Sequence, residues 1–316
     1  MKCLFAPLEG ITDGIFRRTH AAFFGGVEEY YIPFIRLTAS HSLTGKENRE
    51  TDPKENAGVP AVPQVLTRDP EVFVWAAGVL KERGFPRIDL NLGCPAPTVV
   101  SRGRGSAMLK DPAFLEGFFD RVFPLCPLPV SVKTRVGFSS PEESGGILRL
   151  LSAYPFERVV IHPRTTAEQY GGKTHLDIFL RAAERLGARA VYNGDLFDRE
   201  AIDAFERACP GQERVMIGRG LLRDPALGRM MGGGGDASGE ELHAFLEALY
   251  RGYLARFGNP VALGRMKKLL FFLCEGLFDA HRLQKAVKKA ACEERYLEAR
   301  DGVIRAWQDR PGRSGV

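Results

Sequence analysis

Short apolar runs recur along the first 218 residues of the chain, and each is five or six residues long. Val, Ile and Leu dominate most of them, as expected of strands that are buried on both faces of a sheet. The runs predict eight strands, at residues 2–7, 30–35, 61–66, 88–92, 130–134, 158–162, 189–193 and 214–218.

Helical patterns separate nearly all of these strands. Several helix starts are marked by a capping residue followed by proline, which suits the first helical position. The segment after the second strand is different, because residues 37–58 are polar and have no apolar face. We therefore expect an irregular loop in that segment. The marked helix starts are Asp69-Pro70, Asp111-Pro112, Ser140-Pro141 and Asp224-Pro225.

Eight alternations of strand and helix predict an α/β fold, a (β/α)8 TIM barrel whose parallel sheet closes on itself. The active site of such a barrel lies at the C-terminal ends of its strands. The residues that the chain places at these ends are Pro7, Gln64, Asn91, Cys94, Lys133, His162, Asn193 and Gly218.

A second, smaller domain is expected after the barrel. Met231 is followed by GGGGDASG, and four consecutive glycines do not join a packed helix readily. We place the boundary at 232–239, with a barrel domain over 1–235 and an all-α helical domain over 240–316. Apolar residues at helical spacing begin at Leu242, further helical patterns cover about 261–276 and 279–300, and residues 308–316 are expected to fray.

Positive charge is concentrated in the helical domain. Residues 251–290 hold nine Lys and Arg and two acidic residues, a net charge of +7 against +5 for the whole chain. Such concentration is typical of a surface for a polyanion, although a solvated helix face also carries many charges. Phe271, Phe272 and Phe278 lie among the basic residues, and we expect these rings to pack in the core.

Composition narrows the class of protein. The chain has 316 residues, of which 44% are hydrophobic and 26% charged, as in ordinary globular proteins. It contains no apolar run of about 18 residues and no signal-peptide pattern at its start. Its six cysteines form no C-x-x-C pair, so neither a metal site nor a disulfide framework is indicated. We expect a cytoplasmic protein without metal or membrane contact, and a monomer.

The fourth predicted strand leads into the most chemically suggestive stretch. Cys94 follows the strand and Gly93, and a loop with Arg102, Gly103, Arg104 and Gly105 comes next. A thiol at a strand end beside a basic glycine-rich loop is a plausible place for chemistry on an anionic substrate. Free cysteines are, however, usually buried and merely pack.

The turns after the last two strands form a second candidate site. TIM barrels often bind a phosphate at this corner, through backbone N–H groups and a helix N-terminus. Glycine is also common in ordinary turns between strand and helix, so both interpretations remain open. The residues in question are Asn193, Gly194, Asp195, Gly218 and Arg219.

The sequence from Asn91 to Pro95 resembles the N-x-G-C-P signature of the tRNA-dihydrouridine synthases. Six further segments follow the order of that family, and together they span most of the chain. Two positions depart from its pattern, since Leu8 stands where Met is usual and Pro163 where Gly is usual. The matching segments are 6–13, 64, 91–95, 133–137, 162–165, 193–195 and 218–220.

The resemblance implies a flavin enzyme that reduces the C5=C6 bond of uridine in tRNA. FMN would supply a hydride to C6 and NADPH would reduce the flavin again, while Cys94 would donate the proton to C5. The expected cofactor-binding residues are Pro7, Leu8, Glu9, Gln64, Asn91, Lys133, His162, Asn193, Gly194, Asp195, Gly218 and Arg219. The expected tRNA contacts are Arg102, Arg104, Arg164, Arg265, Lys267 and Lys268.

Two alternatives remain at this point. A non-catalytic RNA-binding or tRNA-folding protein could retain the same scaffold, but Cys94 and Lys133 argue against it. A flavin reductase of a small pyrimidine is the second alternative, and the basic helical domain argues against that one.

Overall fold

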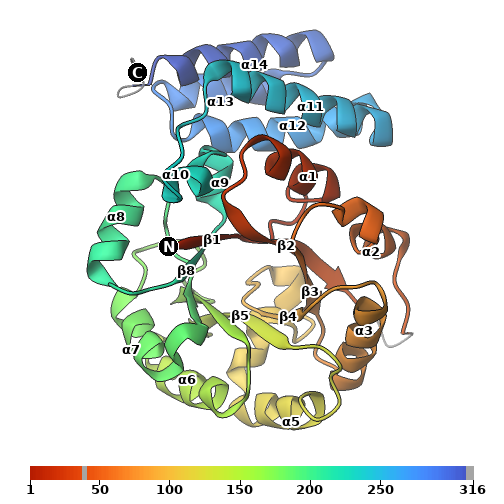
Figure 1. Ribbon diagram of the computed structural model, residues 1–316, viewed down its shortest axis with the longest axis vertical. Coiled ribbons are helices and arrows are strands. Elements are labelled where there is room, and N and C mark those ends of the chain that lie inside the picture. Colours follow the sequence, from red (N-terminus) through yellow and green to blue (C-terminus); the bar gives the residue numbers. More distant parts are fainter. Residues whose placement is uncertain (38–40, 311–316) are drawn as a thin grey trace.

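The computed structural model describes residues 1–37 and 41–310 and contains a closed barrel of eight parallel strands (Figure 1). Each strand pairs with the next along the chain, and β8 pairs with β1. The predicted TIM barrel is confirmed. The strands are β1 (Lys2–Phe5), β2 (Val27–Arg36), β3 (Ala61–Leu66), β4 (Ile88–Leu92), β5 (Val130–Gly137), β6 (Arg158–Thr165), β7 (Ala190–Tyr192) and β8 (Arg214–Ile217).

Three strands run further than their apolar runs predicted. β2 spans Val27–Arg36 where 30–35 was predicted. β5 continues to Gly137 and β6 to Thr165. The added residues include Arg135 and Arg164, whose guanidinium groups are buried against backbone carbonyls. A polar residue ends an apolar pattern in sequence, but tertiary hydrogen bonds can keep it inside a strand.

The barrel helices form an outer ring around the sheet. Asp69 and Asp111 accept hydrogen bonds from the first turns of α3 and α5, as their Asp-Pro starts predicted. Ser140 caps the short 3-10 helix Pro141–Glu143 ahead of α6. Asp224-Pro225 does not start a helix directly, because α10 begins at Leu227. The ring comprises α1 (Gly14–Phe23), α3 (Pro70–Glu82), α5 (Pro112–Val122), α6 (Ser144–Ala153), α7 (Leu176–Leu186), α8 (Arg199–Ala208), α9 (Arg219–Arg223) and α10 (Leu227–Met231).

The segment after β2 is more regular than expected. It contains α2 (Gly45–Glu50) and a 3-10 helix over Pro53–Asn56, so the expectation of an irregular loop was wrong. Arg17 of α1 is buried and donates to Glu50 and Asn56. Polar contacts therefore hold this segment, which is why no apolar face marks it in the sequence. Residues 38–40 lie outside the described part of the chain.

Four helices follow the glycine-rich stretch and pack on one side of the barrel (Figure 1). They are α11 (Gly239–Phe257), α12 (Asn259–Cys274), α13 (Ala280–Lys289) and α14 (Glu293–Gln308). Contacts to the barrel run from α11 to α1 and from α12 to α9. The expected all-α region is present, although residues 311–316 lie outside the described part.

A single helix over 279–300 was predicted, and the structure instead divides it into α13 and α14. The side chain of Lys267 on α12 donates to the carbonyls of Lys288 and Ala290, at 3.0 and 2.7 Å. These bonds satisfy carbonyl groups at the C-terminus of α13, where no intrahelical donor remains. A tertiary contact thus ends a helix that the local sequence would extend.

The barrel interior below the strand ends is filled by a small apolar cluster. The members of the interior cluster are Leu4, Ala6, Tyr31, Val62, Val160, Val191 and Met216.

Within the described residues, no helix has the length and hydrophobicity needed to cross a bilayer.

Candidate active site

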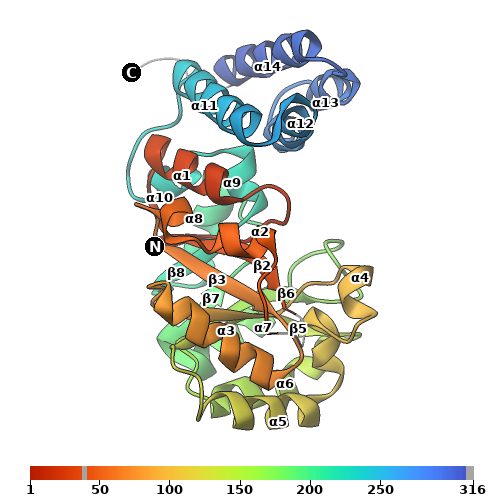
Figure 2. The same ribbon diagram turned by 90° about the vertical axis from the view of Figure 1, so that its right-hand side faces the viewer.

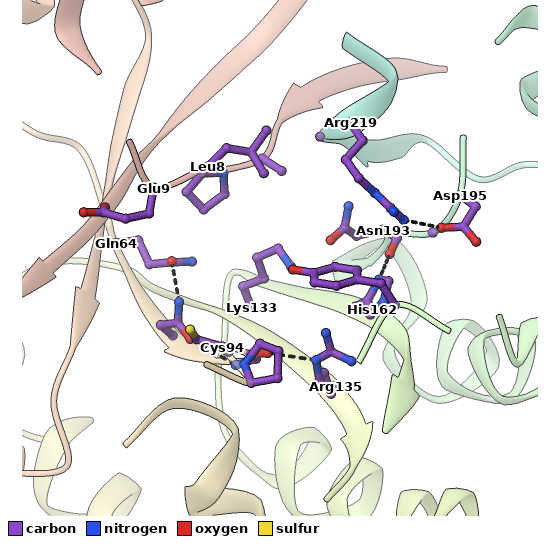
Figure 3. Close-up of a pocket in the computed structure, with 18 of the residues that line it drawn as sticks. Leu8, Glu9, Gln64, Cys94, Lys133, Arg135, His162, Asn193, Asp195 and Arg219 are labelled. Carbon is purple, nitrogen blue, oxygen red and sulfur yellow. Dashed lines mark hydrogen bonds and ion pairs between the residues drawn. The ribbon is translucent and has the colours of Figure 1, made fainter. Parts of the chain in front are cut away.

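A pocket opens at the C-terminal ends of the strands and holds about 960 Å³ of empty space continuous with solvent. The structure brings all the expected catalytic and cofactor-binding positions to this pocket (Figure 3). They are Pro7, Leu8, Glu9, Gln64, Asn91, Cys94, Lys133, His162, Asn193, Gly194, Asp195, Gly218 and Arg219.

Cys94 is half-buried, and the backbone around it is fixed by hydrogen bonds. The side-chain oxygen of Asn91 accepts from the N–H groups of Gly93 and Cys94, at 3.1 and 2.9 Å. Ser106 donates to the carbonyl of Cys94 at 2.9 Å, and Arg135 donates to the carbonyl of Gly93. Burial raises the pKa of the thiol, so Cys94 is protonated at neutral pH and is a potential acid.

Lys133 brings a positive charge into the pocket from β5. Burial, followed by the neighbouring Arg135, lowers its pKa to about 8, while Asp89 and Cys94 act in the opposite direction. The lysine is therefore mostly cationic at neutral pH. Lys133 is half-buried, and the structure records no hydrogen bond or ion pair for its amine among the described residues. A partly desolvated cation of this kind is suited to an electron-rich or anionic ligand.

His162 of β6 is neutral in this environment. Burial, followed by the charges of Lys133 and Arg135, lowers its pKa well below the usual value. Its Nδ1 lies 2.6 Å from the carbonyl of Asn193 and so carries the hydrogen. Nε2 is then a buried acceptor, and it has no partner within the described residues. The pocket therefore offers an unused acceptor next to the Lys133 cation.

Pro163, which departs from the family pattern, leaves β6 intact. The strand continues from His162 through Pro163 to Thr165. The carbonyl of Pro163 accepts from the N–H of His175 at 2.8 Å, which ties the following loop to the strand.

The turns after β7 and β8 form one corner of the pocket. A Cβ on Gly194 would overlap the ring of Tyr192, and one on Gly220 would overlap the carbonyl of Leu196. Packing within the protein therefore already requires these glycines. The first N–H groups of α9 have no intrahelical acceptors, and Arg219 lies beside them with its guanidinium 4.9 Å from the Phe197 ring. This corner presents donors and a cation, as an anion site requires.

Asp195 does not act as a free carboxylate in this corner. It accepts two hydrogen bonds from Arg164, at 3.0 and 2.5 Å, and one from Arg219 at 2.9 Å. Arg164 is buried and also donates to the carbonyls of Gly171 and Gly172. The expectation that Arg164 contacts tRNA does not agree with this burial. Its role here is to hold the corner together.

Two of the other expected tRNA contacts also have intramolecular roles. Arg265 forms an ion pair with Asp13 and lies over the ring of Phe257, while Lys267 ends α13. Lys268 and Arg102 are exposed, and Arg104 is half-buried on the loop after β4. Only the latter three keep side chains available to a partner on the surface.

Sequence reasoning missed Arg135 and Tyr170, which both line the pocket. Arg135 follows Lys133 by two positions on one strand, so strand alternation places both on the same face. That signal was available. Tyr170 lies in a polar loop without periodicity, and its position over the guanidinium groups of Arg135 and Arg219 arises only in the folded chain.

The sequence is similar to those of known proteins from one enzyme family. The dihydrouridine synthase (Dus) family model matches residues 4–298. A protein of Pseudomonas putida named tRNA-dihydrouridine(16) synthase is 31% identical over 296 residues, covering 89% of this chain and 90% of the relative. A probable tRNA-dihydrouridine synthase 1 of Synechocystis is 31% identical over 229 residues, covering 72% of this chain and 63% of the relative.

Solved structures support the fold. Morphinone reductase superposes with a TM-score of 0.51 at 12% identity, covering 75% of this chain and 87% of that chain. A likeness at this identity concerns the barrel alone, whereas the family match extends over nearly the whole sequence. The chain belongs to the dihydrouridine synthase family.

Proposed function

We propose that the protein reduces a uridine of tRNA to 5,6-dihydrouridine, with FMN as its cofactor and NADPH as the reductant of the flavin. The observation that carries this proposal is the meeting of a protonated thiol, a buried cation and an anion-binding corner in one pocket of a dihydrouridine synthase. Relatives from Pseudomonas putida and Ralstonia nicotianae are named for position 16. We therefore propose uridine 16 as the target. We also propose the cytoplasm as the compartment.

The residues present fit a flavin mononucleotide. The corner of Gly218 and Arg219 suits the phosphate, whereas the amide of Gln64, expected to bond the flavin edge, is already bonded to Asp89 and Asn91. Lys133 would hold its charge near an electron-rich edge of the flavin, and the unpartnered Nε2 of His162 would accept a hydrogen bond. When bound, the flavin supplies the hydride that uridine reduction needs.

Cys94 is the residue that we propose as the proton donor. Its raised pKa keeps the thiol protonated at neutral pH. The N–H of Cys94 donates to Asn91 and its carbonyl accepts from Ser106, and these two bonds hold its backbone in one position. A base inside the pocket must first leave its stack in the tRNA, at a cost of a few kcal/mol. Contacts to the tRNA backbone would compensate that cost, and Arg102 and Arg104 lie on the same loop as Cys94.

The helical region is our candidate for the main tRNA contact, with residues 1–235 as the FMN-binding domain and 240–316 as the tRNA-binding domain. On α13, Arg282, Lys285 and Lys289 are exposed. Phe278, just before this helix, is 86% exposed, so the expectation that this ring packs in the core was wrong. An exposed aromatic beside basic residues suits an RNA surface. Figure 2 shows α13 and α4 (Pro97–Val100), on the loop after Cys94, on the same side of the molecule.

The proposed function can be tested directly. Dihydrouridine is mapped in tRNA from cells with and without this gene, and the purified protein is examined for bound FMN and for NADPH oxidation. Loss of dihydrouridine at one position, restored by the gene, is the expected result. A protein that binds tRNA but purifies without flavin would instead be a non-catalytic RNA-binding protein. Reduction of free uridine or uracil without tRNA would indicate a small-pyrimidine reductase.

A further inference from the structure

Beneath the pocket lies a carboxylate that the proposed reaction does not use. Asp89 of β4 is fully buried inside the barrel. Ser131 of β5 and the amide nitrogen of Gln64 on β3 each donate to it, at 2.7 Å. A buried carboxylate costs free energy even when it is hydrogen-bonded. A purely structural core would be more stable with an apolar residue at this position.

Asp89 is connected to Cys94 through two amide side chains. The oxygen of Gln64 accepts from the amide nitrogen of Asn91 at 2.7 Å. The oxygen of Asn91 then accepts from the backbone N–H groups of Gly93 and Cys94. Asp89 and Asn91 are two residues apart on β4 and share a face, and Gln64 pairs with Asp89 in the sheet register. We call this series of bonds, from Asp89 to the Cys94 amide, the amide relay.

Every bond of the amide relay runs in the same direction. A glutamine or asparagine amide has a donor end and an acceptor end and can turn over, so its own chemistry does not fix its orientation. An ionised carboxylate can only accept. It favours the nitrogen of Gln64 toward Asp89 and leaves the oxygen for Asn91. The backbone N–H groups of Gly93 and Cys94 can only donate and require the oxygen of Asn91, so both ends of the relay favour the same direction.

We propose that Asp89 is a positioning residue, whose charge strengthens the bond at the inner end of the amide relay and thereby helps to hold the backbone of Cys94 in place. The importance of Cys94 rests on the proposed function, but the direction of the relay does not. The proposal also gives a reason for a charge in the barrel interior, since a hydrogen bond to an ionised carboxylate is about twice as strong as one to a neutral amide.

The protonation of Asp89 provides a reversible test. Burial raises its pKa to about 6, against the opposing bonds from Gln64 and Ser131. The other charged or titratable groups that act on it are Lys133, which favours the carboxylate, and Glu29, which opposes it; the buried hydroxyl of Tyr31 also faces it. Above this pKa the carboxylate only accepts. Below it the charge is lost, the bond from Gln64 weakens, and the relay is held mainly from its Gly93 and Cys94 end.

The experiment measures hydrogen–deuterium exchange at the amides of Gly93 and Cys94 in the full-length protein, between about pH 5 and about pH 8, after correction for intrinsic exchange. Asp89→Asn is expected to raise exchange at these amides about tenfold at neutral pH and to remove its pH dependence. The wild type should show the same rise as the pH falls through about 6. Alkylation of Cys94 is followed alongside, with the exposed Cys292 as internal reference.

Ser131→Ala is the matched variant, because it removes one bond to Asp89 but leaves an ionised acceptor. It should keep the protection at neutral pH and move the acid midpoint upward, since the Ser131 bond lowers the Asp89 pKa. Wild-type protection at all pH values in Asp89→Asn would overturn the proposal. If that variant does not fold, a wild-type profile that is flat between about pH 5 and about pH 8 overturns it equally. Absence of tRNA reduction in the wild type would count against the proposed function and leave the exchange result standing.

Discussion

At the scale of single residues, the chemistry of the pocket depends on the protonation states of Cys94 and Lys133, which their surroundings determine. Burial keeps the Cys94 thiol protonated, and the same lack of solvent lowers the pKa of Lys133 to about 8. An acid and a cation in one enclosed space are what a reduction by hydride and proton transfer requires. Each of these two residues can be tested separately from the other.

Cys94→Ala should preserve FMN binding and NADPH oxidation but slow single-turnover reduction of tRNA by about 10² to 10⁴-fold, the usual effect of removing a general acid. The exposed Cys292→Ala is the matched control and should behave as the wild type. The measurement is anaerobic mixing of the reduced holoenzyme with tRNA lacking dihydrouridine. A near-normal rate in Cys94→Ala would assign the proton to another donor.

Lys133→Met should affect cofactor binding and stability in opposite directions. The folded pKa of about 8 lies below the ordinary 10.5, so the stabilising contribution of Lys133 is complete above pH 10.5 and is lost as pH falls through about 8. At pH 7 the buried ammonium therefore destabilises the cofactor-free protein, and Met should stabilise it by about 1–3 kcal/mol. FMN should bind more weakly to the variant, and binding to the wild type should weaken as pH rises through about 8.

The two effects of Lys133→Met are measured by urea unfolding of the cofactor-free protein and by FMN titration. Lys81→Met, at an exposed position of α3, is the control and should leave both unchanged. Unaltered FMN affinity together with lower stability would make Lys133 a structural residue.

At the scale of elements, periodicity located all eight strands but not all their ends, and it was insufficient where polar side chains hold the backbone. Residues 61–66 and 88–92 match the observed bounds of β3 and β4, because both runs are buried along their whole length. The end of α13 and the course of α2 depend on Lys267 and Arg17, which bond to segments distant in sequence. No local pattern carries that information.

The candidate site likewise has a part that the sequence predicted and a part that it could not. Strand ends and the motif around Cys94 predicted the members of the pocket, since a barrel brings all its strand ends together. The sequence could not show that Arg164 is buried against Asp195, or that Phe278 is exposed. Both depend on which neighbours the folded chain provides.

His20 gives a prediction that belongs to the junction of α1 with the barrel. It is buried, with Nδ1 2.8 Å from the hydroxyl of Tyr30 and Nε2 2.9 Å from the carbonyl of Pro225. Burial lowers its pKa to about 3. Because the folded pKa is depressed, the stabilising contribution is complete above the ordinary 6.5 and is lost as pH falls toward about 3.

Replacing His20 by Gln removes this titration and retains a donor and an acceptor. The free energy of unfolding should then fall less steeply below about pH 6, by as much as about 1.4 kcal/mol per pH unit. His243→Gln, at an exposed position of α11, is the control. Urea unfolding at several pH values gives the slopes, and equal slopes in His20→Gln and the wild type would show that His20 does not contribute to acid sensitivity.

At the scale of the whole molecule, α4 on the loop after Cys94 and the basic helix α13 lie on the same side (Figure 2). Together they offer one extended surface to a large anionic partner. The charge of the chain supports this arrangement, because residues 251–290 carry +7 while the whole chain carries +5. A partner that contacts both parts would be held by phosphate contacts on α13 while one base enters the barrel.

This arrangement predicts the effect of reversing two charges on α13. Lys285→Glu with Lys289→Glu should weaken tRNA binding and reduce its dependence on salt, because fewer counterions are released when fewer phosphates are neutralised. Each lost phosphate contact should lower the log–log slope of affinity against salt by about 0.7 to 0.9.

The side chains of Lys285 and Lys289 are exposed, so the helices should remain folded. Lys267 is unsuitable for this test because it holds the end of α13. Lys81→Glu with Arg185→Glu changes the net charge equally on exposed barrel helices and should leave the slope unaltered. Affinities measured at several salt concentrations decide the matter: equal slopes for both double variants would mean that α13 is only a solvated face, and that the barrel rim around Arg102 and Arg104 binds the tRNA alone.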